Sequence, residues 1–296
     1  MGMTSSDQLP DPDATLQVWR QGDVTLDAGL TFLHFADLSQ PISPAARQTA
    51  EAMLRQGEAL PEGPVPLMDD VPGFVMLTQT CDVVRPSAER PYVEVAPLIL
   101  VSPEWLEDIR MLRRPAFAYV PALAEERLVA DLDRIMTVEK AVVASWRRIP
   151  GWSTDPEIRA FAKALARKRA RFAFPDDFNA ATAKLQERFK KRHNRQHAEG
   201  AHLKALSEIR IRAAPSWDSD QVAISLWFIK SGDPEGIPAA WPDWVDAWTA
   251  LFDESGRFQI ETAVACLLQD MTARDYVESD RLDLDQLSVS PERKRG

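Results

Sequence analysis

FVMLTQTCDVVRPSAERPYVEVAPLI, residues 74–99, carries the alternation that decides the fold of the first half of the chain. It holds two runs rich in apolar and β-branched residues, Phe74–Gln79 and Tyr92–Ile99, on either side of a proline-containing turn. This pattern predicts two strands. Because strand side chains alternate between two faces, Val75 and Leu77 are expected on one face and their neighbours on the other. Residues 80–82 are expected to end the first strand at a surface cleft.

Segments on either side of this stretch predict a small β-barrel with helical insertions. A strand pair is expected from Gly22, a helix starting at Ser43-Pro44 and ending at Gly57, and then a loop rich in Pro and Gly. The remaining expected elements are a helix at 103–111, strands at 115–123 and 127–132, and a helix that begins within 133–146.

The second half predicts two basic helices, 155–174 and 176–196, with Asp176 or Asp177 capping the second. A β-β-α-β pattern follows, so the whole chain is expected to be α+β. The expected division is a disordered N-terminus at 1–16, a barrel domain at 17–150, a basic helical segment at 151–206, an α+β unit at 207–288 and a tail at 289–296.

Composition is that of a globular protein, with 45% hydrophobic and 27% charged residues among 296. Two cysteines predict no disulfide framework, and no apolar run is long enough to span a bilayer, so a cytoplasmic location without membrane contact is expected. The net charge of −10 is uneven, because Arg159–Arg212 contains 15 Lys/Arg against 5 Asp/Glu. That asymmetry is typical of a nucleic-acid face or of a solvated helical surface beside acidic neighbours.

Three segments resemble, in order, the MazF/PemK family of toxins, which are small SH3-like barrels that cut RNA. QGDVTL resembles the opening strand of the family, residues 74–99 resemble its core strand, loop and Val-Ala-Pro-Ile strand, and LVADLDRIMTVEKAVV resembles its closing strand and helix. The resemblance covers about residues 18–146. It implies an SH3-like barrel and a bacterial conflict setting, such as a toxin–antitoxin or phage-defence locus.

The chain departs from the family at two positions of the RNA-cleaving site. Family members place an arginine just before the core strand, where it stabilises charge on the phosphate, and here Gly73 precedes Phe74. A Thr or Ser of the family corresponds to Ile99 or Leu100. The usual ribonuclease site is therefore not expected.

Cys81, Asp82 and Arg85 are the candidate catalytic residues. Cys81 has two interpretations: a nucleophile activated by a cation or by His34, or a small buried hydrophobe at a strand end beside an Asp82 that caps the turn. In a third interpretation the segment binds a ligand without covalent chemistry. The candidate nucleic-acid contacts are Gln79, Arg85, Arg90, Lys190, Lys191, Arg192 and Arg195.

Other constellations favour structural roles. His193 and His197 have zinc-like spacing, but the cations between them and the lack of a completing ligand argue against metal. Phe172, Phe174 and Phe178 could stack on bases, although an anchoring role in the core is favoured. Trp241, Trp244 and Trp248 fall on one helix face. No cofactor motif is present, so neither a cofactor nor a metal is expected.

Three functions remain open from the sequence. The first is a MazF-like protein that recognises RNA or another ligand without the usual ribonuclease site. The second is a metal-independent, sequence-specific endoribonuclease in which Arg85 or Arg90 replaces the missing arginine. The third is a non-enzymatic assembly protein that binds a partner, and the expected partner is a protein encoded at the same locus.

Overall fold

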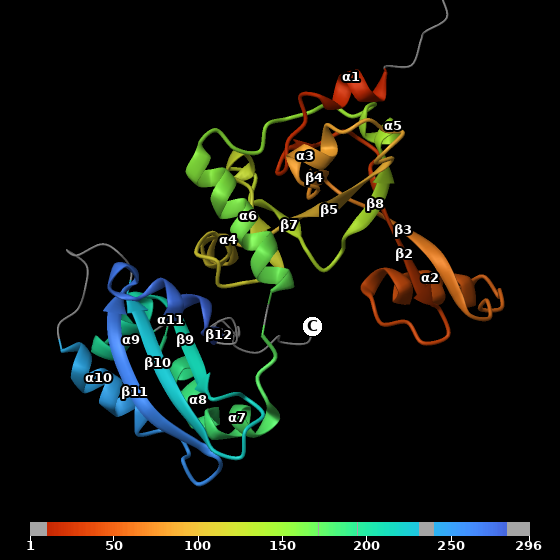
Figure 1. Cartoon of the computed structure of the whole chain (residues 1–296). Coiled ribbons are helices and arrows are strands. Elements are labelled where there is room, and N and C mark those ends of the chain that lie inside the picture. The colour runs from red at the N-terminus through yellow and green to blue at the C-terminus, as the bar shows by residue number, and fades with distance from the viewer. Residues whose placement is uncertain (1–10, 171, 194, 231–239, 283–296) are drawn as a thin grey trace, which may run out of the picture. The chain divides into compact units, whose positions relative to one another are not determined.

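The computed structural model describes residues 11–170, 172–193, 195–230 and 240–282, and the chain divides into two compact units, 1–169 and 170–296 (Figure 1). Both units mix helices with sheets, so the α+β class is confirmed. None of the helices in the described ranges is long and apolar enough to cross a membrane. The expected tail at 289–296 and most of the expected disordered N-terminus lie outside the described residues.

The first unit contains a six-stranded sheet in the order β1-β4-β5-β7-β6, with β8 also paired to β5. All neighbouring pairs in it are antiparallel, and β5 pairs with β8 through its first half and with β7 through its last residues. The strands are β1 (Val24–Thr25), β4 (Phe74–Met76), β5 (Tyr92–Leu100), β6 (Phe117–Tyr119), β7 (Leu128–Asp131) and β8 (Met136–Glu139).

The predicted alternation along β4 is confirmed. Val75 and Leu77 pack into one core cluster, whereas Phe74 and Met76 pack into two others. The regular strand ends at Met76, earlier than the predicted Gln79, although Leu77 remains buried. Both faces of β4 are therefore covered.

Residues 30–71 form what we call the arm, a two-stranded sheet of β2 (Thr31–Asp37) and β3 (Pro64–Asp70) with helix α2 (Pro44–Arg55). The helix was predicted, and Ser43 caps it by accepting a hydrogen bond from the Ala46 amide. Two expectations were wrong: β1 and β2 do not pair with each other, and the expected loop contains β3. The prolines of β3 suggested a loop, but a two-stranded sheet tolerates them on its outer edge.

The N-terminal and closing segments also differ from expectation. Residues 12–16 form helix α1 (Pro12–Leu16), whose Leu16 is buried, within the region expected to be disordered. The segment expected to begin a helix starts instead with β8, because its backbone pairs with that of β5, and α5 (Lys140–Val143) is the helical part. Helix α4 (Pro103–Arg110) is confirmed.

The first basic helix, α6 (Asp155–Arg169), belongs to the first unit, where Phe161 and Ala164 pack against its core. The boundary between units therefore falls inside the segment expected at 151–206. The second basic helix is interrupted at Thr182, and its N-cap is Pro175 rather than an aspartate. Asp177 instead makes an ion pair with Arg257.

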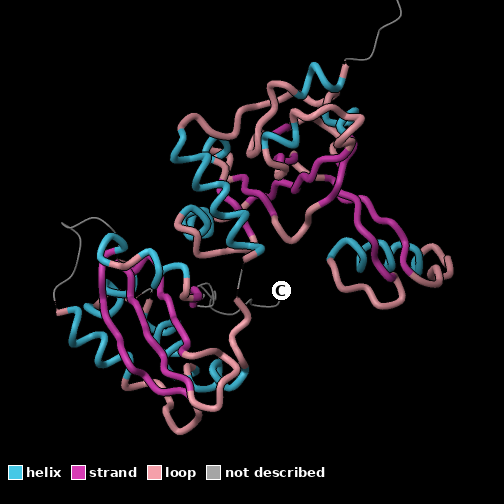
Figure 2. Tube along the Cα trace, viewed as in Figure 1, coloured by secondary structure: helices cyan, strands magenta, loops and turns pink. Residues whose placement is uncertain are grey.

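The second unit is built on a sheet in the order β11-β10-β9-β12, with β10 and β11 parallel. Figure 2 shows its strands in magenta and its helices in cyan. The predicted β-β-α-β pattern is confirmed, and its core is shared with the preceding helices. The elements are α7 (Asp176–Ala181), α8 (Ala183–Arg192), α9 (Ala198–Lys204), β9 (Leu206–Ala214), β10 (Val222–Lys230), α10 (Trp241–Thr249), β11 (Phe258–Leu267), α11 (Ala273–Val277) and β12 (Asp280–Leu282).

Aromatic side chains fill this core. Phe174 and Phe178 contact Trp217, and Trp248 packs against Phe189 and Phe228. The anchoring interpretation is thereby confirmed for Phe174 and Phe178, whereas Phe172 is 39% exposed. The core interpretation of the tryptophan helix is also confirmed.

Candidate functional site

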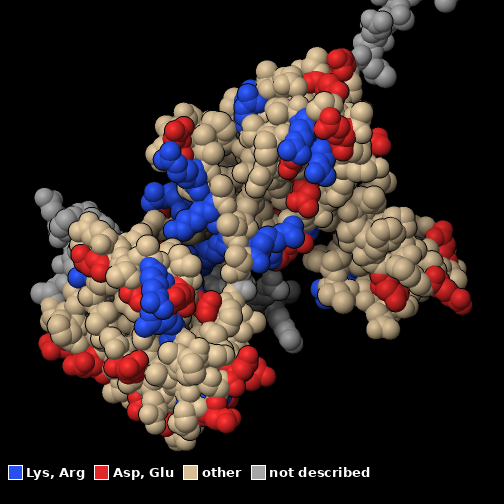
Figure 3. Space-filling model, in the orientation of Figure 1, with Lys and Arg blue, Asp and Glu red and all other residues tan. Residues whose placement is uncertain are grey.

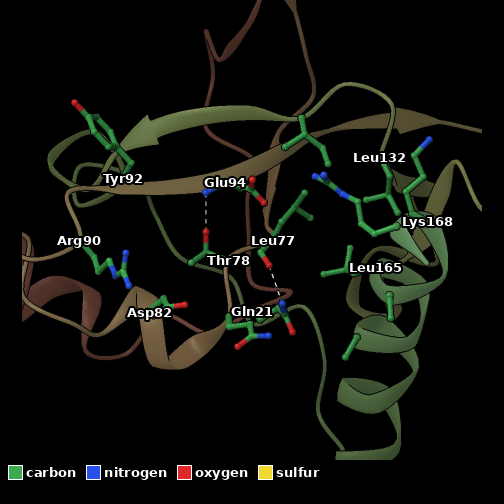
Figure 4. Close-up of a pocket in the computed structure, with 15 residues that line it drawn as sticks. Gln21, Leu77, Thr78, Asp82, Arg90, Tyr92, Glu94, Leu132, Leu165 and Lys168 are labelled. Carbon is green, nitrogen blue, oxygen red and sulfur yellow. Dashed lines mark hydrogen bonds between the residues drawn. The ribbon is translucent and has the colours of Figure 1, made fainter. Parts of the chain in front are cut away.

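A pocket of about 790 Å³ opens in the first unit where the chain leaves β4 (Figure 4). This volume lies in the range typical of small-molecule sites. One wall comes from the segment after β4, from β5 and from Gln21; the other comes from α6 and the turn between β7 and β8. The lining residues are Gln21, Leu77, Thr78, Gln79, Asp82, Arg90, Tyr92, Glu94, Leu132, Ile135, Ala162, Leu165, Ala166, Lys168 and Arg169.

Hydrogen bonds fix the backbone of the first wall. The Thr78 hydroxyl accepts from the Glu94 amide at 2.6 Å, and the Gln21 side-chain amide donates to the Leu77 carbonyl at 2.7 Å (both dashed in Figure 4). The Gln21 backbone amide donates to the Thr80 hydroxyl at 3.1 Å. These bonds occupy Gln21 and fix both ends of the segment. The side chain of Gln79, which lies between them, is exposed and lines the pocket.

Helix α3 (Thr80–Val83) is a single turn that carries two of the predicted catalytic candidates, Cys81 and Asp82, and Arg85 follows it. Asp82 lines the pocket and faces Arg85, with 3.5 Å between carboxylate and guanidinium. Asp82 makes no side-chain cap of this turn, so its predicted capping role is wrong. Arg85 does not line the pocket, whereas Arg90 lies on the same side of it as Asp82 (Figure 4).

A buried lysine donates hydrogen bonds to the backbone of α3 and of the residues that follow it. Lys140, at the start of α5, is 1% exposed, and its Nζ donates to the carbonyls of Asp82 at 3.0 Å and Arg85 at 2.6 Å. Burial lowers the pKa of this amine. The two bonds satisfy carbonyls at the carboxyl end of the turn, where a cation also suits the local dipole.

Cys81 is exposed and does not line the pocket. The expectation of a buried hydrophobe is therefore wrong, because the helical turn points this side chain away from the core. Its Sγ lies 3.7 Å from the Gln79 side-chain oxygen. His34, the candidate base, lies on β2 with its ring 3.9 Å from Asp69, so the structure does not bring the two residues of the proposed pair together.

The pocket wall opposite α3 combines apolar side chains with two basic residues. Leu132, Ile135 and Leu165 line it together with two cations from the end of α6. Lys168 pairs with Asp133, while Arg169 is exposed and has no ion-pair partner among the described residues.

Several pocket residues were not predicted as site residues. Tyr92 and Glu94 are exposed members of β5, and their alternation with the buried Val93 and Val95 is visible in the sequence. That alternation was a usable signal for outward-facing side chains. Lys168 and Arg169 gave no comparable signal, because nothing in the sequence places the end of α6 beside this strand.

The remaining predicted nucleic-acid residues lie in the second unit, at the end of α8. Lys191 pairs with Glu187 at 2.6 Å, Arg192 lies 3.8 Å from the buried Glu199, and Arg195 is exposed. Lys190 is also exposed on α8. Three of the predicted contacts thus belong to the first unit and four to the second.

The histidines of this segment have structural contacts. His197 caps α9 by accepting from the Gly200 amide at 3.0 Å, and His202 packs against Trp241 and Trp244. Across the described ranges, no three His, Cys, Asp or Glu residues gather as a metal site would require.

In the pocket of the first unit, Arg90, Arg169 and Tyr92 are groups suited to an anionic ligand with an aromatic ring.

Comparison of the chain with protein-family models, with curated proteins and with solved structures found no match.

Proposed function

We infer that the first unit is a MazF/PemK-like, SH3-like barrel that binds single-stranded RNA in its pocket without cutting it. The observation that carries this proposal is that Gln79, Arg90 and Tyr92 line the same pocket. Tyr92 is 57% exposed and offers a ring on which a base can stack. Arg90 can neutralise a phosphate, and the Gln79 amide can both donate and accept a hydrogen bond.

Gly73 supports binding over cleavage. A Cβ atom at this position would lie 2.1 Å from the Thr25 carbonyl oxygen and 2.8 Å from the Leu26 side chain. An arginine cannot stand there unless the backbone moves. The cation that the resemblance places before the core strand is therefore excluded by packing, and with it a large electrostatic contribution to cleavage.

The proposed setting is a bacterial toxin–antitoxin or phage-defence locus, which rests on the resemblance alone. The strand pairing supports a barrel-like first unit, since β5 joins β4, β7 and β8 in one antiparallel arrangement. Short strands that curl around one core are typical of such small barrels.

Fluorescence anisotropy with the full chain and labelled single-stranded RNA of about 15 nucleotides tests the proposal. Tyr92→Ala should weaken binding about tenfold, because stacking on an aromatic ring is worth about 1–3 kcal/mol per base. Arg90→Gln should reduce the slope of log K against log salt by about 0.7, the value of one phosphate contact.

Matched controls separate the pocket from the general surface. Leu100→Ala changes an exposed side chain on the same strand outside the pocket, and Arg147→Gln removes an exposed cation elsewhere in the unit. Neither should alter RNA affinity. Equal affinity of wild type, Tyr92→Ala and Arg90→Gln would overturn the proposal.

An endoribonuclease is the second candidate, favoured by the Asp82–Arg85 ion pair and by Arg90 beside it (Figure 4). A carboxylate as base with a neighbouring guanidinium as electrostatic stabiliser would suit metal-independent cleavage. Incubation of a long RNA with wild type and with Asp82→Asn in EDTA decides between the two. Cleavage that is lost in Asp82→Asn would establish the enzyme, and intact RNA with retained binding supports recognition alone.

A further inference from the structure

The face of the β2–β3 sheet that lies opposite α2 is exposed and apolar. On β2 and β3 the side chains alternate, so Ala36, Val65 and Leu67 face α2 in a small cluster of their own. The opposite side chains form two cross-strand pairs, Leu33 with Met68 and Phe35 with Pro66. Their exposure is 49% for Leu33 and 73% for both Phe35 and Met68. We call these four residues the arm patch.

A contiguous apolar patch in the middle of a sheet face differs from scattered exposed residues. Single exposed apolar side chains are ordinary on protein surfaces, but neighbouring ones commonly mark an interaction site. In the arm patch the two members of each cross-strand pair lie directly opposite each other, with Cβ atoms about 5 Å apart, and the two pairs follow one another along the same face.

Acidic residues frame the patch. The next cross-strand pairs on the same face are Thr31 with Asp70 and Asp37 with Pro64, so a carboxylate stands at each end. Hydrogen bonds from the Ser39 hydroxyl and amide lower the pKa of Asp37. Residues 30–71 contain six Asp or Glu against two Arg and no Lys. The arm, at the right of Figure 3, accordingly shows red side chains on a largely uncharged surface.

The edge of β3 argues against strand addition. Pro64 and Pro66 have no amide hydrogen, so two alternate positions of the strand cannot donate to an added strand. A partner at β3 is therefore expected on the apolar face and not on the strand edge. Sheets bury their faces under helices or other sheets, and α2 already covers the opposite face of the same two strands.

We propose that the arm patch docks a basic, amphipathic helix of a partner protein. The apolar face of that helix would cover Leu33, Phe35 and Met68, and its lysines or arginines would meet Asp37 and Asp70. These aspartates stand about 20 Å apart, six residues along β2, which matches a helix of about 13 residues. The acidic frame disfavours a nucleic acid or an anionic membrane as occupant, and it also disfavours a second copy of the same acidic face.

The test uses a fluorescein-labelled synthetic peptide of about 14 residues, with leucines on one helical face and lysines towards both ends. Its counterpart carries glutamate in place of every lysine. Anisotropy is measured with the full chain, with the double variant Phe35→Ser/Met68→Ser and with the double variant Asp37→Asn/Asp70→Asn. Val18→Ser/Val277→Ser, which removes two exposed apolar side chains elsewhere, is the control.

The lysine peptide should bind the wild type and the control with equal affinity. Its affinity should be at least about tenfold lower for Phe35→Ser/Met68→Ser and several-fold lower for Asp37→Asn/Asp70→Asn. The last difference should vanish at high salt. All four changed arm residues are exposed, and circular dichroism checks that the variants remain folded. Equal affinity of wild type and Phe35→Ser/Met68→Ser, absent binding, or equal binding of the glutamate peptide would overturn the proposal. Sedimentation of the wild type as a dimer that Phe35→Ser/Met68→Ser dissociates would show a second copy as the occupant and overturn it too.

Discussion

Leu77 joins the main core of the first unit to the pocket, because its side chain is 6% exposed while the residues that follow it line the cavity. Leu77→Asp would place an unpaired charge in that core, which is costly in an apolar environment. We expect the first unit to lose its folded structure, measured by near-ultraviolet circular dichroism and by urea unfolding. Gln79→Asp, two residues further along and exposed, is the control. A folded, cooperative Leu77→Asp protein would contradict the core assignment.

Cys81→Ser should leave RNA binding, and any cleavage, within a few-fold of wild type. The thiol is exposed, lies outside the pocket lining and has no described histidine beside it. A reactive cysteine needs a neighbour that favours its thiolate form. Anisotropy and RNA gels measure both activities. Complete loss of an activity in a variant with an unchanged melting temperature would make Cys81 the nucleophile.

At the scale of single residues, the sequence predicted positions within strands better than positions within turns. The two faces of β4 followed from a period of two, which Val75 and Leu77 obey. Cys81 could not be placed in the same way, since a one-turn helix has too few residues to show a period. Of the site residues, Gln79, Asp82 and Arg90 do line the pocket, whereas Arg85 does not.

Among the elements, α3 depends most on a single distant side chain, that of Lys140. Lys140→Met would remove both hydrogen bonds to the Asp82 and Arg85 carbonyls. Unsatisfied buried carbonyls cost about 1–3 kcal/mol, so the free energy of unfolding should fall by about that amount. Urea unfolding measures it, with Lys184→Met, at an exposed position in the second unit, as the control.

The effect of Lys140→Met should also depend on pH. Burial lowers the pKa of the Lys140 amine below its ordinary 10.5, so the unfolded chain binds more protons between the two values. The free energy of unfolding of the wild type therefore increases as pH rises through that window. The methionine variant lacks the amine, so its free energy of unfolding does not change for this reason. The difference between the two proteins should therefore grow towards pH 10.5. A constant or shrinking difference would contradict the assigned direction of the pKa.

Longer elements were predictable where one period ran for many residues, as in β5, β10 and α2. β3 was missed because Pro64 and Pro66 are strong loop signals, and only its pairing with β2 overrides them. β8 was missed because helix-forming residues follow Met136 and Val138 directly, and the strand exists through its pairing with β5. Both misses concern strands whose stability comes from a distant partner.

On the scale of the whole chain, positive charge is divided between the units. The pocket of the first unit presents Arg90, Lys168 and Arg169, while Lys190, Lys191, Arg192 and Arg195 gather at the end of α8 in the second. Figure 3 shows basic side chains on both units. The sequence indicated the excess of charge in Arg159–Arg212, but it could not show that α6 packs with the first unit and the later helices with the second.

If the α8 cluster also contacts RNA, its contribution is electrostatic and separable from that of the pocket. Replacing Lys190, Lys191, Arg192 and Arg195 by glutamine should lower the slope of log K against log salt by up to about 3, since each phosphate contact on a single strand contributes about 0.7. The measured decrease should be smaller than this upper limit, because Lys191 and Arg192 already lie close to the carboxylates of Glu187 and Glu199. Sequence preference should not change, because phosphate contacts carry no base information.

The matched control neutralises four exposed arginines outside both groups, Arg47, Arg55, Arg110 and Arg147, and thereby removes the same net charge from the chain. A general field effect would lower RNA affinity equally in the two quadruple variants, whereas direct contact at α8 lowers it in the first alone. If affinity and salt slope stay at wild-type values after the α8 replacements, the RNA contact belongs to the pocket only. The basic end of α8 is then a solvated helix surface, the other interpretation that its charge pattern allows.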